Sequence, residues 1–537
     1  MRPLEKLVRR IRRSYLRRMM RGFRNLKKSG KLGAISAIQL ELTTHNLNID
    51  ERFFSARFFG SGLGSAELII RQYLLLRVGD LKLNRALLFA AGKSGGKVVF
   101  AMPPQWINVL ETNGFEVDRL ASTLLWAGYV TAAYFYGLFT IGKILVGSGG
   151  AEARECVVKP YVYFDALAPD NIPSTTSDRV SYTIVSWYLQ WQGRNIDVEA
   201  IHHAVPNVPC KRIENHNLVE RASPLPMLAG LYEFTVYLRW ASTALVIGAF
   251  DLLRGRWWHA FILNQAGLAE QARVVPSDLL AREYLFHNSG WFYRPLWTHE
   301  VERCGSTVSL YFYSTNCESI KRTKEMSPIP YGWEAMNWPR YLVWDEGQSN
   351  HVRRAVGDDA IVEIVGPIWF SDSGKTARRL PPKVAAIFDV QPVRESYIRS
   401  LACEFDNCTP DVVRQFLCDI RDALGTIDCY MAHKRKREIG RLLHPHYRLA
   451  LKELAYSSHY LEIEPDLPAE VLIQNCDLVI SMPFTSTAII AKHADKPSIY
   501  YDPTSLVQKD DPAAHDVLVI QGKDELLHWL ETALASV

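Results

Sequence analysis

Short apolar runs alternate with amphipathic segments over the last third of this 537-residue chain. The runs predict buried strands, because they are brief, rich in β-branched and aromatic residues and bounded by polar turns. Strands are expected at Val384–Val390, Ile427–Ala432, Tyr460–Ile463, Leu478–Ser481, Ser498–Tyr501 and Val517–Ile520, and helices at Pro410–Leu424, Pro445–Leu454, Ala469–Asn475, Thr485–His493 and Lys523–Ala533. Strands that alternate with helices in this way predict a doubly wound parallel sheet.

A second α/β domain is expected upstream. Tyr161–Phe164, Val308–Tyr313 and Tyr341–Trp344 are predicted strands, and the stretch from Arg85 to Asp118 has a βα-like pattern. In that stretch Ala86–Ala91 and Val98–Met102 are expected to be strands, and a helix is expected from Pro104. Polar and proline-rich sequence at Phe370–Lys383 marks the boundary, so we expect an N-terminal domain over 33–370 and a C-terminal domain over 371–537.

Three segments suggest contact with a membrane. Residues 1–32 combine an apolar stripe at three- and four-residue steps with many arginines, as in a basic amphipathic helix suited to anionic lipid. A solvated or partner-binding helix is the alternative. Segments 120–142 and 234–263 are long and apolar, but the Arg and Asp within the second argue against a simple span. We expect re-entrant, interfacial or buried helices there.

Charge and cysteine content narrow the class of protein. Thirteen Lys and Arg against one Glu give residues 1–32 a net charge of +12, so the rest of a chain of net charge +5 carries −7. A nucleic-acid-binding body would need basic surface there, and none is expected. The nine cysteines include no CxxC pair, and no Asp-x-Asp occurs, so we expect neither a zinc site nor a metal-dependent transferase with that motif.

The strongest chemical signal lies in two turns of the C-terminal domain. Thr485, Ser486 and Thr487 begin a helix directly after a predicted strand, where hydroxyls, backbone N–H groups and the helix dipole favour an anion. Upstream, His444 precedes a helix that starts at Pro445. Together the turns predict a nucleotide-sugar phosphate site, although each alone is as well explained by helix capping.

Several other polar residues are candidates. Lys434 and Lys436 could meet phosphate charge, and Glu464 could bind ribose or base, or else form part of a surface run or a turn. Asp345, with Glu346 in reserve, follows a predicted strand and could take the proton of an acceptor hydroxyl. An acidic turn is the alternative there. His287 and Asn288 are acceptor-side candidates, with satisfied core or turn residues as the other interpretation.

Short motifs carry a resemblance to a known family. Met482-Pro-Phe-Thr-Ser486 resembles the signature of the polysaccharide biosynthesis PFTS motif proteins, which are linked to bacterial surface polysaccharide. Asn288–Trp291, Tyr313–Glu318 and Met336–Pro339 look like the same family, and Asn316 joins the acceptor-side candidates on this ground.

A looser similarity is to bacterial sialyltransferases and related CMP-sugar glycosyltransferases of GT-B fold. Asp345-Glu-Gly347, His444-Pro445 and Ser486-Thr487 match three of their motifs in type and order. The resemblance implies two Rossmann-like domains facing a cleft, an inverting metal-independent transfer, and a CMP-activated acidic sugar such as a nonulosonic acid as donor. No further cofactor is implied. The acceptor is expected to be a lipid-linked glycan at the cytoplasmic face of the inner membrane.

Two alternatives stay open from the sequence. The same fold could use a UDP- or GDP-sugar, or the chain could be a non-catalytic scaffold of a polysaccharide assembly complex. The oligomeric state is not predicted.

Overall fold

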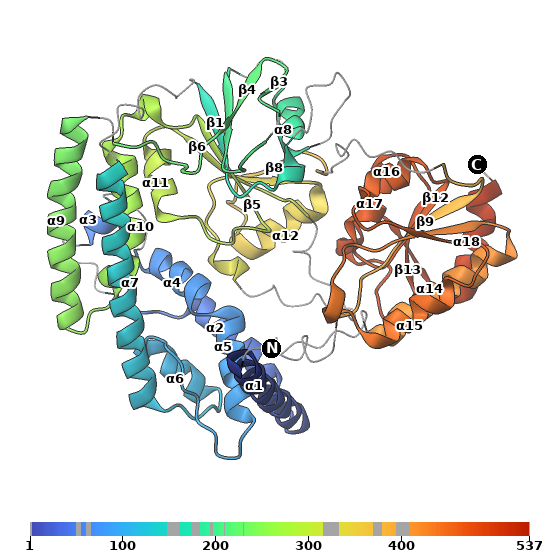
Figure 1. The fold of residues 1–537 in the computed structure, drawn as a ribbon, viewed down its shortest axis with the longest axis horizontal. Helices are drawn as coiled ribbons and strands as arrows, with labels where there is room; N and C mark the ends of the chain where they lie inside the picture. The colour runs from blue at the N-terminus through green and yellow to red at the C-terminus, as the bar shows by residue number, and fades with distance from the viewer. Residues whose placement is uncertain are drawn as a thin grey trace.

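The computed structural model contains two α/β domains and a layer of long helices (Figure 1). It describes residues 3–49, 55–60, 66–147, 160–172, 183–193, 197–208, 210–228, 230–314, 332–368, 379–393 and 409–535. The expected pair of Rossmann-like domains is confirmed by two separate parallel sheets. The predicted boundary at Phe370–Lys383 lies largely outside the described residues.

The C-terminal sheet has six parallel strands in the order β11-β10-β9-β12-β13-β14. Its strands are β9 (Val384–Phe388), β10 (Tyr430–Lys434), β11 (Tyr460–Ile463), β12 (Leu478–Ser481), β13 (Ser498–Asp502) and β14 (Leu518–Gln521). Counted along the domain, the order is 3-2-1-4-5-6, as in dinucleotide-binding folds. The direction of winding reverses between β9 and β12, which makes this the switch point of the sheet.

Helices cover both faces of this sheet: α14 (Pro410–Thr426), α15 (Pro445–Leu454), α16 (Ala469–Gln474), α17 (Ser486–His493) and α18 (Gly522–Ala535). Ile387 packs in a cluster with Phe416 and Leu530, while Ala386 packs in another with Leu472. The central strands β9 and β12 are buried along their whole length, and such strands need continuous apolar sequence, which made them predictable. The edge strands β11 and β14 are partly exposed.

The N-terminal sheet repeats the same winding. Its order is β3-β4-β2-β1-β5-β6-β7-β8, parallel except for the β3–β4 pair. The strands are β1 (Tyr161–Phe164), β2 (Ala200–His203), β3 (Arg212–Ile213), β4 (His216–Glu220), β5 (Glu283–His287), β6 (Thr307–Tyr311), β7 (Tyr341–Val343) and β8 (Val362–Ile364). Here the switch point lies between β1 and β5. Flanking helices are α8 (Ile184–Gln192), α11 (Leu296–Arg303) and α12 (Glu346–Val356).

The remaining helices form a layer beside this sheet: α1 (Pro3–Lys28), α2 (Gly33–Thr44), α3 (Ala56–Phe59), α4 (Ala66–Arg77), α5 (Asp80–Ala91), α6 (Pro104–Thr112), α7 (Arg119–Gly147), α9 (Leu231–Leu253) and α10 (Trp258–Val274). Two expectations were wrong. Ala86–Ala91 lies inside α5, and Val98 forms only a single bridge with Val117 rather than a strand. Segment 234–263 is not one helix, because the chain turns at Gly255 (φ +76°) between α9 and α10.

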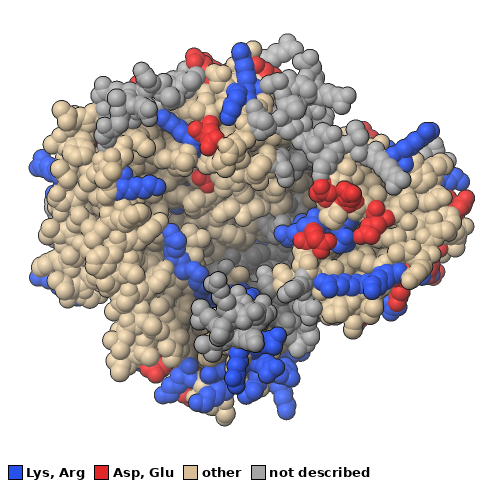
Figure 2. Space-filling view, viewed as in Figure 1, with Lys and Arg blue, Asp and Glu red and all other residues tan. Residues whose placement is uncertain are grey.

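Helix α7 buries only a narrow stripe. Gly137 sits against α10, where an added Cβ would lie 2.7 Å from Leu263. The opposite side exposes large apolar side chains: Leu120, Leu124, Leu125, Phe135, Tyr136, Phe139 and Val146. α9 adds Leu231, Tyr232, Val246, Phe250 and Leu253. Both helices are long and apolar enough to cross a bilayer, judged by length and composition. The face over them is largely free of charge in Figure 2.

Helix α1 is helical as predicted, but half of its apolar stripe is used inside the protein. Met19, Phe23 and Leu26 are buried, whereas Val8 and Ile11 are exposed. Lys and Arg side chains gather at this end of the molecule (Figure 2). The helix packs on α5 at very short range: an added Cβ on Gly22 would lie 1.8 Å from the Leu88 carbonyl oxygen.

Candidate functional site

The turn between β12 and α17 that carries the Pro-Phe-Thr-Ser motif, Met482–Thr487 (the PFTS turn), lies at the switch point of the C-terminal sheet. The Met482 N–H donates to the Phe388 carbonyl at 2.9 Å, so the segments leaving β12 and β9 diverge from adjoining positions. In doubly wound sheets, ligands bind at this place, outside the carboxyl ends of the strands. The predicted phosphate turn therefore occupies the expected position.

Hydrogen bonds within the turn distinguish its three hydroxyls. Thr485 donates to the Met482 carbonyl (2.9 Å), and Thr487 pairs with Ser481 (2.8 Å). Phe484 takes a left-handed conformation (φ +62°), which lets the chain reverse before α17. Ser486, half-buried in the first turn of α17, has no hydrogen bond among the described residues. The geometry leaves Ser486 and the first N–H groups of α17 as ligands for an anion.

A buried polar network that the sequence did not predict stands on the β9 side of the switch point. Asp389, 4% exposed, accepts a hydrogen bond from the Tyr447 hydroxyl and lies 3.1 Å from His433 Nε2. His433 Nδ1 in turn pairs with the Tyr460 hydroxyl at 2.9 Å. Burial, with the Asp389 charge adding, raises the pKa of Tyr447 far above its usual value. Asp389 lies within the strand predicted at Val384–Val390 and directly follows the observed end of β9; a lone carboxylate near the end of an apolar run is the signal that could have identified it.

The other donor-side candidates lie along the same edge, but most have structural roles. His444 caps α15, with Nδ1 accepting from the His446 N–H at 3.2 Å. Pro445 is the first residue of that helix. Lys434 is buried, donates to the Pro465 carbonyl at 3.1 Å, and has a pKa lowered by burial. Lys436 and Glu464 are exposed.

At the N-terminal switch point, Asp165 follows β1 and His287 ends β5. The indole N–H of Trp291 donates to Asp165, and burial raises the pKa of that carboxyl although the Trp291 bond opposes the shift. His287 Nε2 lies 3.2 Å from the Ala166 carbonyl, and burial lowers its pKa. Asn288 accepts from the Tyr313 N–H at 2.8 Å. Asn316 lies outside the described residues.

Asp345 also lies at the carboxyl edge of the N-terminal sheet, just after β7, but its side chain faces the C-terminal domain. It caps α12 by accepting from the Gln348 N–H (3.0 Å) and accepts a second hydrogen bond from His515 Nδ1. Burial alone would raise the pKa of Asp345; the His515 and Gln348 bonds outweigh it and lower the pKa. Gly347 permits this approach, because an added Cβ would lie 3.3 Å from Asp345 Oδ1 and 3.5 Å from His515 Nδ1.

No hydrogen bond among the described residues joins Asp345 to the PFTS turn, although the Asp345 charge helps to raise the pKa of Tyr500, whose hydroxyl donates to the Thr485 carbonyl at 2.8 Å. His515 lies just before β14, and Lys492 in the last turn of α17 donates to its carbonyl (3.3 Å). Asp345 therefore lies near the C-terminal end of α17, whereas Ser486 is in the first turn, roughly 10 Å away along the axis. Glu346, beside it, is exposed.

The family model for polysaccharide biosynthesis PFTS motif proteins matches residues 240–530, more than half of the chain. This chain belongs to that family. The match includes the PFTS turn, the segment around Asn288 and the Asp345 turn, so the family resemblance drawn from these motifs is confirmed. No curated protein matches the chain.

Solved structures with a distant likeness include several that act on sugars. The UDP-GlcNAc 2-epimerase from Methanocaldococcus jannaschii shares 10% identity, covers 69% of this chain and 91% of its own, and gives a TM-score of 0.33. The wall teichoic acid polymerase TagF shares 9% identity over 76% of this chain and 88% of its own (TM-score 0.37). HepE from Anabaena, in complex with UDP and glucose, shares 9% identity, covers 70% of this chain and 89% of its own, and gives a TM-score of 0.35. With such TM-scores, these likenesses say nothing of what this PFTS protein binds.

Proposed function

We propose that this protein is an inverting, metal-independent glycosyltransferase of bacterial surface polysaccharide biosynthesis. It transfers a sugar from a nucleotide donor to a lipid-linked glycan. The observation that carries the proposal is the C-terminal switch point, where Ser486 and the first turn of α17 stand ready for an anion. Membership of a polysaccharide biosynthesis family supplies the substrate class.

On the donor side, Ser486, the N–H groups of α17 and His444 bind the leaving phosphate. Because His444 Nδ1 accepts a backbone N–H, the neutral ring carries its proton on Nε2, which makes that atom the donor toward a phosphate oxygen. Thr485 and Thr487 shape the turn, and Lys434 and Lys436 contribute positive potential. Glu464 directly follows strand β11 and is proposed to contact the ribose or base of the donor.

The donor is a CMP-activated nonulosonic acid in the favoured version, and a UDP- or GDP-sugar in the other. A thermal-shift series with CMP, UDP, GDP and their sugars distinguishes the two. Stabilisation by none of them would support the non-catalytic scaffold instead.

Ser486→Ala is expected to weaken nucleotide binding by roughly 1–3 kcal/mol, because a phosphate oxygen loses its partner in a half-buried site. Isothermal titration calorimetry measures this. Ser458→Ala, an exposed serine on the loop before β11, is the matched control and should bind like the unmodified protein. Equal affinity of both variants would remove Ser486 from the site.

Two carboxylates compete for the role of catalytic base. Asp345 matches the acidic motif, but its lowered pKa and two hydrogen bonds weaken it as a base. Asp165 has a raised pKa, as suits proton transfer near neutral pH. They follow β1 and β7, three strands apart, which corresponds to roughly 14 Å, so one acceptor hydroxyl cannot use both.

Replacing the true base by Asn should lower turnover by roughly 10²–10⁴-fold while donor binding is kept. We therefore expect one of Asp345→Asn and Asp165→Asn to lose turnover in this way and the other to lose much less. Glu346→Gln tests the reserve carboxylate of the same turn. Near-normal turnover in both aspartate variants would place the base elsewhere.

We place the protein at the cytoplasmic face of the bacterial inner membrane. Support comes from the exposed apolar sides of α7 and α9 together with the arginines of α1. The free energy of membrane binding by such a surface is the sum of apolar burial and electrostatic attraction to anionic lipid.

A further inference from the structure

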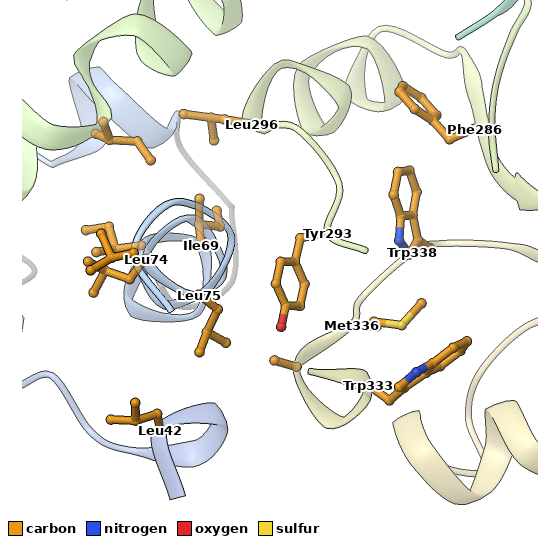
Figure 3. Close-up of a cluster of buried hydrophobic side chains, with 14 of the residues drawn as sticks. Leu42, Ile69, Leu74, Leu75, Phe286, Tyr293, Leu296, Trp333, Met336 and Trp338 are labelled. Atoms are coloured by element: carbon orange, nitrogen blue, oxygen red, sulfur yellow. The ribbon is translucent and has the colours of Figure 1, made fainter. Parts of the chain in front are cut away.

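A cavity of about 340 Å³ lies between α4, α10 and the loop that follows β5. Ile69, Tyr73 and Arg77 line it from α4, and Gly290, Trp291 and Tyr293 line it from the loop. Figure 3 shows how Tyr293 stands between α4, which carries Ile69 and Leu75, and the segment with Met336 and Trp338. None of the candidate residues predicted from the sequence lines this cavity.

The cavity adjoins the switch point of the N-terminal sheet. Trp291, in its wall, donates its indole N–H to Asp165 at the end of β1. An added Cβ on Gly290 would lie 3.0 Å from the ring of His287, at the end of β5. This is the place where parallel sheets bind their ligands, so the cavity stands beside the expected acceptor position.

Its lining is basic. Arg77, Lys82 and Arg294 contribute positive charge, and no Asp or Glu is among the lining residues. Arg294 is already bound to Glu302 and Thr298. Arg77 lies over the ring of Tyr73 at 5.2 Å, and Lys82 Nζ donates to the Arg77 carbonyl at 2.7 Å. Among the described residues neither cation has a carboxylate partner, which suits the pair to an anion.

Helix α7 lies close to the wall of the cavity. Phe261 of α10 contacts Tyr73 in the cavity wall (ring centroids 5.0 Å) and Tyr129 of α7 (6.3 Å). Leu76, another lining residue, is 46% exposed. Exposed apolar side chains then follow along α7. The basic cavity and the exposed apolar side of α7 thus lie close together.

We propose that this cavity binds the phosphate of a lipid-linked acceptor, with Arg77 and Lys82 as its ligands and the lipid chain along α7. The inference rests on the proposed function for the identity of the acceptor. A water-soluble phosphate would use the cations but not the apolar side of α7. If the phosphate binds the two cations and the lipid chain lies along α7, the glycan end of the acceptor points toward Asp165 and His287.

The test measures binding of the full-length protein to phosphatidylcholine vesicles that contain a few mole per cent of a long-chain alkyl phosphate. Vesicles with a fatty acid of equal chain length provide the same apolar chain with a carboxylate. The unmodified protein should bind the phosphate vesicles better, and inorganic phosphate at millimolar concentration should not displace it. The double variant Arg77→Ala/Lys82→Ala should lose this preference, with binding to phosphate vesicles weakened roughly tenfold.

Lys93→Ala/Lys97→Ala removes two exposed positive charges outside the cavity and should keep the preference. Arg77 and Lys82 are exposed, so the variant is expected to fold, and circular dichroism checks this. An unchanged preference in Arg77→Ala/Lys82→Ala, or equal binding to both kinds of vesicle by the unmodified protein, would overturn the proposal. Neither donor nor turnover enters this measurement, so its failure leaves the nucleotide test of the glycosyltransferase proposal standing, and the reverse holds.

Discussion

At the scale of single residues, the pairing of Asp345 with His515 links the two domains. Ala488 and Ile489 of α17 share a buried cluster with Val352 of α12, and the polar pair stands at the edge of that contact. The carboxyl of Asp345 is 28% exposed, so its hydrogen bond with His515 is only partly screened by water.

Asp345→Asn should therefore destabilise the protein at neutral pH by roughly 1–2 kcal/mol, since the charged hydrogen bond is lost while Asn still caps α12. Because the pKa of Asp345 is lowered in the fold, the stabilisation is complete above the unfolded-state pKa of about 3.9 and is lost as pH falls through the lower folded pKa. Urea unfolding at pH 7 and near pH 2, below the unfolded-state pKa, measures the difference. Glu346→Gln should change little, and an equal loss there would point to the turn as a whole.

The sequence located candidate site residues only where local pattern and the expected position of a ligand coincide. The PFTS turn was predictable because three hydroxyls follow a buried strand directly. The Asp389 network was not, since Tyr447 and Tyr460 come from other elements and meet Asp389 only in the folded sheet. Asp345 was expected from its turn, but its contact with His515 joins residues 170 positions apart and could not be inferred.

At the scale of elements, the success of prediction followed burial. Strands buried on both faces, such as β9 and β12, have continuous apolar sequence and were located to within two residues. Ala86–Ala91 has the same appearance but lies in α5, because packing against α1 fixes the helix where local pattern was ambiguous. Apolar α7 was expected to be a re-entrant, interfacial or buried helix, and its exposed apolar side argues against a buried core helix.

Helix α7 should carry the salt-resistant part of membrane binding. Phe139 is 67% exposed, so Phe139→Glu should reduce binding to vesicles markedly even at high salt, because a charge is placed in the apolar face. Co-sedimentation at low and high salt measures this. Tyr456→Glu, which changes a side chain 92% exposed on the C-terminal domain, should have no effect. Equal binding of both variants at high salt would argue against membrane contact through α7.

At the scale of the whole molecule, the buried histidines make the N-terminal part sensitive to acid. Burial, with the charges of Arg221 and His203 adding, lowers the pKa of His202 to about 3. His299 is lowered to about 3 and His351 to about 4, in both cases chiefly by burial. The unfolded chain binds these protons more readily, so stability should fall as pH drops below about 6.5 and continue falling toward the folded pKa values.

Each such histidine should cost about 2 kcal/mol of stability between pH 8 and pH 5. His202 stacks on Tyr161 at 4.0 Å, and its ring nitrogens have no partner among the described residues. His202→Phe keeps the ring stacked on Tyr161. It should reduce the loss of unfolding free energy between pH 8 and pH 5 by about 2 kcal/mol, measured by thermal or urea unfolding. His446→Phe, at an exposed position, should leave the pH profile unchanged, and a profile equally steep in His202→Phe would assign the acid sensitivity to other groups.

The glycines between α1 and α5 have a mechanical consequence. Gly22 faces the Leu88 carbonyl, and Gly92 faces the backbone of Arg18, where an added Cβ would lie 2.3 Å from the carbonyl oxygen. Two helices whose backbones are in contact cannot shift relative to one another, so α1 is held rigidly against α5 and is not a flexible linker. A bilayer that captures its arginines would hold the whole helical layer at one tilt. The orientation of the body, and not the length of a linker, would then set the height above the membrane at which a sugar is added.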